Sequence, residues 1–396
     1  MTVVDLRPRR ALVQDLGSPT RWPALDGVRG LAVLAVVGWH VFGMLAPSGH
    51  IGPSNVPWMW WPMGTGRFGV DIFFVLSGFL VVRSWRATRA RSGGFVAAAR
   101  DFARRRALRI LPAYWVSLAI LVPLTAPALL TDVKRLFLLG SVNQYVLPDL
   151  PGAVNTVYWS LTTEWHFYLL VPLVVFLMAR AGRWTVLAGC VALSAMWWSH
   201  VPPLGLPASF IFGRLDQFVA GAIAGELVVQ AQSGHSTALI RALRTRVVAL
   251  GAVVAVLALG IYHGSTFGHA RGNLFDPFLH PLVALCVAAG LVALCSRPRT
   301  TVFDARGLRF AGLISYGLYL WHYPIFEHGL RWTGVEAPIG AMDALIVVLL
   351  LALSLGAAVL SYLVVERPFL HRKASAPRNR EVIGAELASP ELSSVA

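Results

Sequence analysis

Charged residues are scarce in this sequence. They occupy 13% of its 396 positions, whereas 56% of the positions are hydrophobic. Soluble proteins carry roughly 25% charged residues, so the polar side chains here are too few to cover two or three soluble domains. Continuous apolar stretches recur instead, at about the 20-residue length with which a helix crosses a bilayer. Since only helices and closed barrels satisfy their backbone in lipid, these continuous stretches predict an all-α, polytopic transmembrane bundle.

Acidic residues are also few: 19 Asp and Glu stand against 34 Lys and Arg, and the formal net charge is +15. Such a charge can indicate a nucleic-acid partner. The basic residues, however, lie between the apolar stretches, where positively charged loops of membrane proteins lie. We therefore expect a lipid bilayer as a partner and no nucleic acid.

Only three cysteines occur, Cys190, Cys286 and Cys295, and all three fall in apolar segments. The last two are nine residues apart on one predicted helix, ~13 Å along its axis, which is too far for a disulfide. No group of residues has the spacing of metal ligands. We expect the cysteines to be packing residues, and we expect no metal and no tightly bound cofactor.

Ten apolar segments are candidate membrane spans. The first begins near Leu25, late for a signal peptide and without a clear cleavage site, so we expect it to remain as a span. The predicted spans are 25–46, 67–85, 107–130, 157–179, 184–200, 208–230, 246–263, 277–296, 309–330 and 340–364.

Basic residues set the expected orientation of these spans. With both termini cytoplasmic, the cytoplasmic segments hold 27 Lys and Arg and the outer segments hold 6. This asymmetry obeys the positive-inside rule and predicts a multi-pass protein of the plasma membrane. We expect a cytoplasmic tail at 1–24, a transmembrane domain at 25–370 and a disordered cytoplasmic tail at 371–396.

Ionisable residues inside the predicted spans point to function, because they are costly to place in a bilayer. Counting residues from the span ends puts four of them ~9–12 Å below the outer surface. They come from four different spans, so we expect a shared polar cavity in the outer half of the bundle. The four are His40, Glu164, Arg214 and His322.

Arg29 lies on the same predicted helix as His40 but ~16 Å closer to the cytoplasm. Their separation of eleven residues is close to three helical turns, so both face the same side. A long anionic ligand would fit this arrangement, with its charged end at Arg29 and its reactive end at His40. A nucleotide thioester has that shape.

Other polar residues have structural interpretations beside the functional ones. His322 follows aromatic residues that often anchor a span at the membrane interface. Asp71 can cap its helix or pair with Arg67, and Arg214 can pair with Asp216 or face the cavity. The basic cluster at 104–109 can mark a cytoplasmic loop or contact a nucleotide phosphate.

A series of motifs resembles one family across nearly the whole chain. The motifs are Leu25–Gly30 followed by His40, Gly69–Leu80, Arg109–Trp115, Tyr158–Glu164, Arg214–Gly221, Ile314–Pro324 and Glu366–Phe369. Their order is similar to that of the acyltransferase-3 family, whose signature is an Arg and a His separated by ten residues. The resemblance implies ten transmembrane helices, a cytosolic acyl-CoA co-substrate, usually acetyl-CoA, and transfer to a hydroxyl. The acceptors in the family include envelope glycans, peptidoglycan and macrolides, and the composition here is most similar to actinobacterial members.

On this basis we expect His40 to act as a general base on the acceptor hydroxyl and Glu164 to orient His40. The remaining candidates divide between the two substrates. We expect acyl-CoA to be bound by Arg29, Arg105 and Arg109, and the acceptor by Asp71, Ser160, Arg214, Tyr319 and His322.

Two alternatives remain open at this stage. His40 can carry the acyl group itself instead of acting as a base. The chain can also be a proton-coupled transporter or flippase of a small glycosylated metabolite, because intramembrane ionisable residues mark substrate paths as well. Transporters often contain two similar halves, and no such repeat is visible in the sequence.

Overall fold

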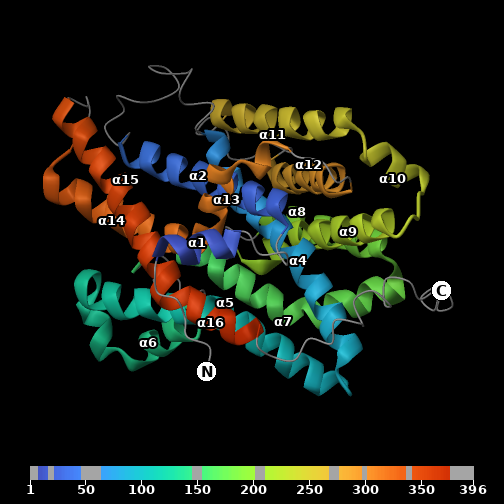
Figure 1. Cartoon of the computed structure of the whole chain (residues 1–396), viewed down its shortest axis with the longest axis horizontal. Coiled ribbons are helices and arrows are strands. Elements are labelled where there is room, and N and C mark those ends of the chain that lie inside the picture. Colours follow the sequence, from blue (N-terminus) through green and yellow to red (C-terminus); the bar gives the residue numbers. More distant parts are fainter. Residues whose placement is uncertain are drawn as a thin grey trace.

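The computed structural model describes residues 8–16, 22–45, 64–144, 154–200, 210–266, 276–296, 301–335 and 341–374. All regular secondary structure within these ranges is helical (Figure 1). The main helices are α1 (Pro8–Leu16), α2 (Pro23–Leu45), α4 (Gly69–Arg91), α5 (Phe95–Thr125), α6 (Val133–Gly140), α7 (Tyr158–Ala181), α8 (Arg183–His200), α9 (Leu215–Gln232), α10 (Ala238–Leu243), α11 (Arg246–Thr266), α12 (Asp276–Cys295), α13 (Arg306–Leu313), α14 (Ser315–Thr333), α15 (Ala341–Ser361) and α16 (Arg367–Ala374). The predicted all-α fold is confirmed.

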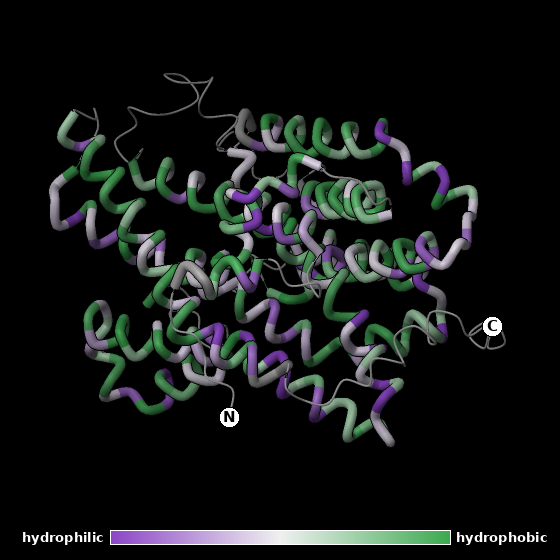
Figure 2. The backbone as a smooth tube through the Cα atoms, viewed as in Figure 1, coloured by the Kyte–Doolittle hydropathy of each residue, from purple (hydrophilic) through white to green (hydrophobic). Residues whose placement is uncertain are grey.

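Helices occupy the positions of all ten predicted spans. Seven helical segments in the described ranges are long and apolar enough to cross a membrane. Figure 2 shows hydrophobic residues along most of their length. Helices α8, α9 and α14 occupy the other three predicted spans, and the count of ten spans and the cytoplasmic termini stay predictions. The seven segments are Pro23–Leu45, Thr65–Arg91, Phe95–Thr125, Tyr158–Ala181, Arg246–His263, Pro277–Cys295 and Ala341–His371.

The centre of the bundle is the crossing of α4 and α9, which glycines bring into close contact (Figure 1). A Cβ on Gly78 would lie 1.9 Å from the carbonyl oxygen of Phe218, and one on Gly221 would lie 1.9 Å from that of Val75. Neither position therefore has room for a larger residue. Small residues let transmembrane helices approach in this way, because lipid offers little hydrophobic force to drive them together.

Helix α5 begins at Phe95, twelve residues before the predicted span at 107–130. The basic residues at 100–109 therefore lie on this helix rather than in a loop. Alanine and arginine, which fill this segment, are both good helix formers, and the hydropathy of a span does not report such an extension.

The predicted span 309–330 is two helices, α13 and α14, which meet at Ile314. Within α14, Pro324 has no backbone N–H to donate to the carbonyl of Leu320. The side-chain amide of Asn155 donates a 2.9 Å hydrogen bond to that carbonyl instead. This contact fixes the part of α14 that carries His322.

The two ends of the described chain pack together. The carboxylate of Asp15 on α1 accepts hydrogen bonds from Arg367 at 2.7 Å and from Tyr362 at 2.9 Å. A short π-helix, Tyr362–Glu366, joins α15 to α16. Helix α1 lies within the predicted tail 1–24, and α16 continues to Ala374, four residues past the predicted end of the domain. Residues 375–396 of the predicted disordered tail lie outside the described residues.

Candidate active site

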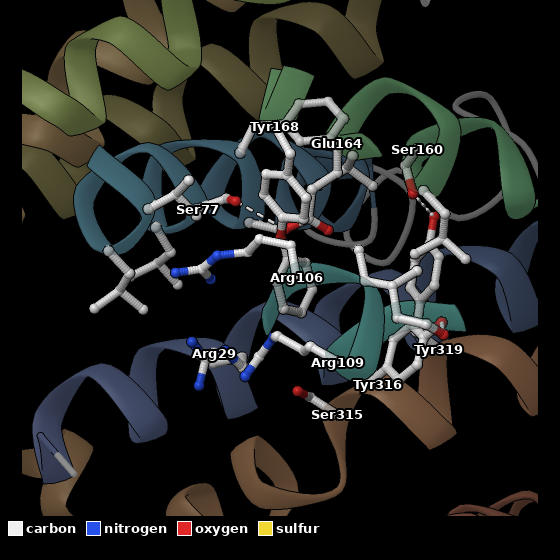
Figure 3. Close-up of a pocket in the computed structure, with 18 residues that line it drawn as sticks. Arg29, Ser77, Arg106, Arg109, Ser160, Glu164, Tyr168, Ser315, Tyr316 and Tyr319 are labelled. Carbon is white, nitrogen blue, oxygen red and sulfur yellow. Dashed lines mark hydrogen bonds between the residues drawn. The ribbon is translucent and has the colours of Figure 1, made fainter. Parts of the chain in front are cut away.

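A cavity of about 110 Å³ lies between α2, α4, α5, α7 and α14 (Figure 3). Apolar side chains form part of its wall. The polar residues that line it are Arg29, Ser77, Arg106, Arg109, Ser160, Glu164, Tyr168, Ser315, Tyr316 and Tyr319. The predicted bundle therefore contains a polar cavity, and the sequence-predicted residues Arg29, Arg109, Ser160, Glu164 and Tyr319 all line it.

Three guanidinium groups line one part of the cavity, from Arg29 on α2 and from Arg106 and Arg109 on α5 (Figure 3). Arg29 forms a 3.1 Å ion pair with Asp26, one helical turn earlier. Arg106 is only 7% exposed, and its guanidinium lies over the rings of Phe102 and Tyr168. Cations of this kind, held in a fixed place, favour an anionic ligand.

Arg105, which we predicted to bind acyl-CoA, does not line this cavity. Its guanidinium pairs with Asp101 and donates a hydrogen bond to Thr88. Successive helical residues point about 100° apart, so Arg105 and Arg106 face different sides of α5. Arg106 and Arg109, three residues apart, share the side that faces the cavity. Arg106 lines the cavity and Arg105 does not, and the run of three arginines in the sequence gave no sign of which one faces inward.

Glu164 also lies in a different place from the one we predicted. Its Oε1 accepts hydrogen bonds from Ser77 on α4, at 2.7 Å, and from Tyr168, one turn further along α7. We expected Glu164 to orient His40. That prediction relied on the similar depth of Glu164 and His40 in the bundle. Depth does not determine which neighbouring helix a side chain faces. Ser77 and Tyr168 were both missed, although Tyr168 has the i, i+4 spacing from Glu164 that brings helical side chains together.

The partner of His40 is His322. Nδ1 of His40 lies 2.8 Å from Nε2 of His322, which is fully buried. This pair lies next to the cavity, because the ring of Tyr319 lines the cavity and its centroid is 5.9 Å from that of His322. The hydroxyl of Tyr319 is 2.7 Å from that of Ser160. The cavity thus runs from three guanidiniums to a hydroxyl pair beside two imidazoles.

Asp71 and Arg214, which we predicted to bind the acceptor, belong to a separate buried cluster. Oδ1 of Asp71 accepts hydrogen bonds from Arg214 at 3.1 Å and from His280 at 2.8 Å. The guanidinium of Arg214 lies 4.9 Å from the ring centroid of Trp198 and also contacts Trp159. His280 was missed, although it is an ionisable residue within the predicted span 277–296. Neither Asp71 nor Arg214 lines the cavity.

Metal ions in proteins are held by groups of His, Cys, Asp and Glu side chains. Within the described ranges, no three of these side chains gather as metal ligands would.

The helical bundle, with its cationic cavity and its histidine pair, belongs to a sequence that matches a known family. The model of an acyltransferase domain, the acyltransferase-3 family, matches residues 22–363. The chain belongs to this family, and it is a multi-pass membrane protein.

Three related proteins align with most of the chain. It is 26% identical over 339 residues to the peptidoglycan O-acetyltransferase OatA of Listeria monocytogenes. The aligned region covers 76% of this chain and 49% of the relative. It is 27% identical over 406 residues to the putative membrane-bound transacylase BcsY of Komagataeibacter xylinus, with 94% and 90% covered. It is 25% identical to the exopolysaccharide production protein ExoZ of Rhizobium meliloti, with 78% and 90% covered.

The chain thus spans about half the length of the peptidoglycan O-acetyltransferase relative and most of the length of the other two. No solved structure matches the chain.

Proposed function

We propose that the protein is an O-acyltransferase that moves an acetyl group from acetyl-CoA to a hydroxyl of a carbohydrate. The proposal is supported by membership of the family and by the cavity, which extends from three guanidiniums to the Ser160–Tyr319 hydroxyl pair beside His322.

The guanidiniums of Arg29, Arg106 and Arg109 are the proposed site for the phosphates of acyl-CoA. Guanidinium groups bind phosphate through two parallel hydrogen bonds, and such charge-assisted bonds are strong where water is excluded. Three guanidiniums and one carboxylate line the cavity, so it favours an anion. In the predicted topology Arg29 lies on the cytoplasmic side of His40, the side from which a cytosolic donor would enter.

The thioester of the donor would then lie near Ser160 and Tyr319. The hydroxyls of these two residues are 2.7 Å apart, and each also lies within hydrogen-bonding distance of the carbonyl oxygen of Val157. Either hydroxyl can turn from that carbonyl to donate to the oxyanion that forms at the thioester carbonyl. The ring of Tyr319 also contacts the ring of His322. Ser160 and Tyr319 are the predicted acceptor-binding residues that line the cavity, and a contact with the transferred acetyl group suits them equally well.

His40 is the proposed general base. Its imidazole takes the proton of the acceptor hydroxyl while the hydroxyl oxygen attacks the thioester carbonyl carbon. The C–O bond forms, the C–S bond breaks, and the thiolate of CoA takes the proton from His40 to leave as a thiol. Base catalysis by a positioned imidazole typically accelerates such a step by about 10²–10⁴-fold.

Glu164 has a different role in this proposal from the predicted one. It lies in the cavity with the guanidiniums and accepts hydrogen bonds from Ser77 and Tyr168. We propose that it holds the guanidiniums in place and balances part of their charge before the donor binds. The orientation of His40 then depends on a neighbour other than Glu164.

A glycan is the proposed acceptor because two of the relatives carry peptidoglycan or exopolysaccharide in their names. The predicted acceptors also include macrolides, which carry hydroxyls as glycans do. The two classes can be compared directly in one acceptor panel.

The test is release of free thiol from acetyl-CoA by the purified protein across glycan and macrolide acceptors. We expect acceptor-dependent release that His40→Ala abolishes while acetyl-CoA binding is kept. His166→Ala is the matched control, because His166 lies on α7 and contacts Asn143 outside the cavity. If a folded protein neither binds acetyl-CoA nor releases thiol, the proposal is wrong and transport becomes the function to test.

A further inference from the structure

The ring of His322 meets the ring of His40 edge to edge. Their nearest nitrogens are 2.8 Å apart, and their ring centroids are 5.1 Å apart with planes inclined by 16°. The difference between the two distances equals about two ring radii. Both nitrogens therefore lie close to the line between the ring centres, as in a well-aligned hydrogen bond.

The other nitrogen of His322 determines which atom of this bond carries the hydrogen. Nδ1 of His322 lies 2.9 Å from the carbonyl oxygen of Leu318, one turn earlier on α14. A carbonyl can only accept, so Nδ1 carries the hydrogen and donates it. A neutral imidazole has one N–H, and Nε2 of His322 is then an acceptor.

The tautomer of His40 follows from that of His322. If Nε2 of His322 accepts, Nδ1 of His40 must donate, and neutral His40 carries its hydrogen on Nδ1. The unprotonated nitrogen of His40 is then Nε2. Within the described part of the chain, no hydrogen bond involves this Nε2, and His40 is only partly buried, so Nε2 can meet a substrate hydroxyl.

A charged His322 would reverse the direction of the bond and remove the base. His322 is 0% exposed, and burial of a charge without a counter-charge is costly. Its contacts among the described residues are the carbonyl of Leu318 and the rings of His40, Tyr319 and Tyr323, none of which is a carboxylate. The surroundings therefore favour the neutral form in the resting enzyme.

We propose that His322 is a positioning residue that holds His40 in the Nδ1–H tautomer, so that Nε2 of His40 is the base. The inference rests on the proposed function of His40. When Nε2 takes the proton of the acceptor hydroxyl, Nδ1–H of His40 still donates to Nε2 of His322, and this charge-assisted hydrogen bond stabilises the His40 imidazolium. The proton returns from Nε2 to the departing thiolate, and the pair regains its resting form. His322 thus acts through His40, whereas the prediction from the sequence was that His322 binds the acceptor.

Two substitutions of His322 separate this role from packing. His322→Leu keeps an apolar side chain of similar bulk but offers no acceptor to His40. His322→Gln can place its amide oxygen where Nε2 was and accept the same hydrogen. We expect His322→Leu to lower kcat by about 10²–10⁴-fold with KM for acetyl-CoA unchanged, because only the tautomer of the base is lost. We expect His322→Gln to recover kcat to within about tenfold of the wild type. His328→Ala, on the same helix, is the control and should match the wild type.

The tautomer itself can be measured by ¹⁵N NMR of histidine-labelled protein, with the His40 signals assigned by their loss in His40→Ala. We expect the wild-type ring to show a protonated Nδ1 and an unprotonated Nε2, and His322→Leu to shift the hydrogen toward Nε2. A wild-type His40 with its hydrogen on Nε2 would overturn the inference even if neither variant folds, and so would a folded His322→Leu with wild-type kcat. Full turnover by His40→Ala would overturn the proposed function itself. Loss of turnover in His40→Ala with normal His322 variants would remove only the inference.

Discussion

Two buried polar regions of the molecule are built from similar residues but differ in the balance between positive and negative side chains. In the cluster of Asp71, Arg214 and His280, one oxygen of the carboxylate accepts hydrogen bonds from the guanidinium and from the imidazole. Three arginines line the cavity together with a single carboxylate, that of Glu164, which accepts hydrogen bonds from two hydroxyls. The first region pairs its guanidinium with a carboxylate. The second has more guanidiniums than carboxylates around an open volume, even when the Arg29–Asp26 pair is counted.

This difference indicates which region can bind a substrate. A buried ion pair that is already complete stabilises a particular packing, and removal of one member leaves a charge behind. A cavity with surplus cations is suited to an anion from outside. We therefore expect substitutions in the first region to act on folding and substitutions in the second to act on catalysis.

The largest effect is expected for Asp71→Ala, which removes the acceptor shared by Arg214 and His280. Loss of one member of a buried pair costs about 3–5 kcal/mol, so we expect poor recovery of folded protein and a markedly lower melting temperature. Thermal unfolding of the detergent-solubilised protein measures this. The double variant Asp71→Ala with Arg214→Met should be more stable than the single variant. If Asp71→Ala melts like the wild type and loses only turnover, the cluster belongs to the active site.

Arg106→Gln is expected to act on the donor and not on the fold. A charge-assisted hydrogen bond contributes about 1.5–3 kcal/mol, so KM for acetyl-CoA should rise about tenfold to a hundredfold with little change in melting temperature. Steady-state kinetics at saturating acceptor gives the value. An unchanged KM would show that the phosphates bind elsewhere.

Tyr319→Phe should affect the chemical step, since it removes only the hydroxyl beside Ser160. We expect kcat to fall about tenfold and the affinity for acetyl-CoA to stay the same. Loss of one donor to a developing charge typically costs about 10²–10³-fold, and here Ser160 can still donate. Ligand binding and turnover measured on the same preparation separate the two quantities. A fall in affinity with normal kcat would instead assign the hydroxyl to ground-state binding.

The smallest effect is expected for Arg105→Gln, which is the matched control for Arg106→Gln. Arg105 pairs with Asp101 on the same helix, and such pairs contribute less than about 1 kcal/mol. KM and kcat should both remain within about twofold of the wild type. A rise in KM as large as that of Arg106→Gln would restore the original prediction that Arg105 binds the donor.

The sequence predicted the helical bundle well because hydrophobic length determines where a span lies. It also placed Arg29 and His40 on one helix, since that relation depends only on helical geometry. It failed where side chains from different helices meet. His40, Glu164, Arg214 and His322 were expected in one cavity from their similar depth, yet the structure distributes them among three neighbouring groups. Rotation of each helix about its axis decides those contacts, and packing sets that rotation.

The hydrogen bond between His40 and His322 shows the same limit. Residues 282 positions apart form it, and neither span contains a signal for the other. Arg105 and Arg106 are adjacent in the sequence, but on a helix their side chains point about 100° apart. A single residue of register therefore separates the arginine that lines the cavity from the arginine that pairs with Asp101.

The central claim is that the acyl end of the donor lies against Nε2 of His40. Bromoacetyl-CoA tests it directly, because its reactive carbon occupies the place of the acetyl methyl group and alkylates the nearest nucleophile by displacing bromide. Peptide mass spectrometry and ¹⁵N NMR then locate the product. The account predicts a single major label on Nε2 of His40, suppressed by excess CoA and reduced in Arg106→Gln. A CoA-protected label on His280, or on any residue away from the cavity, would contradict it.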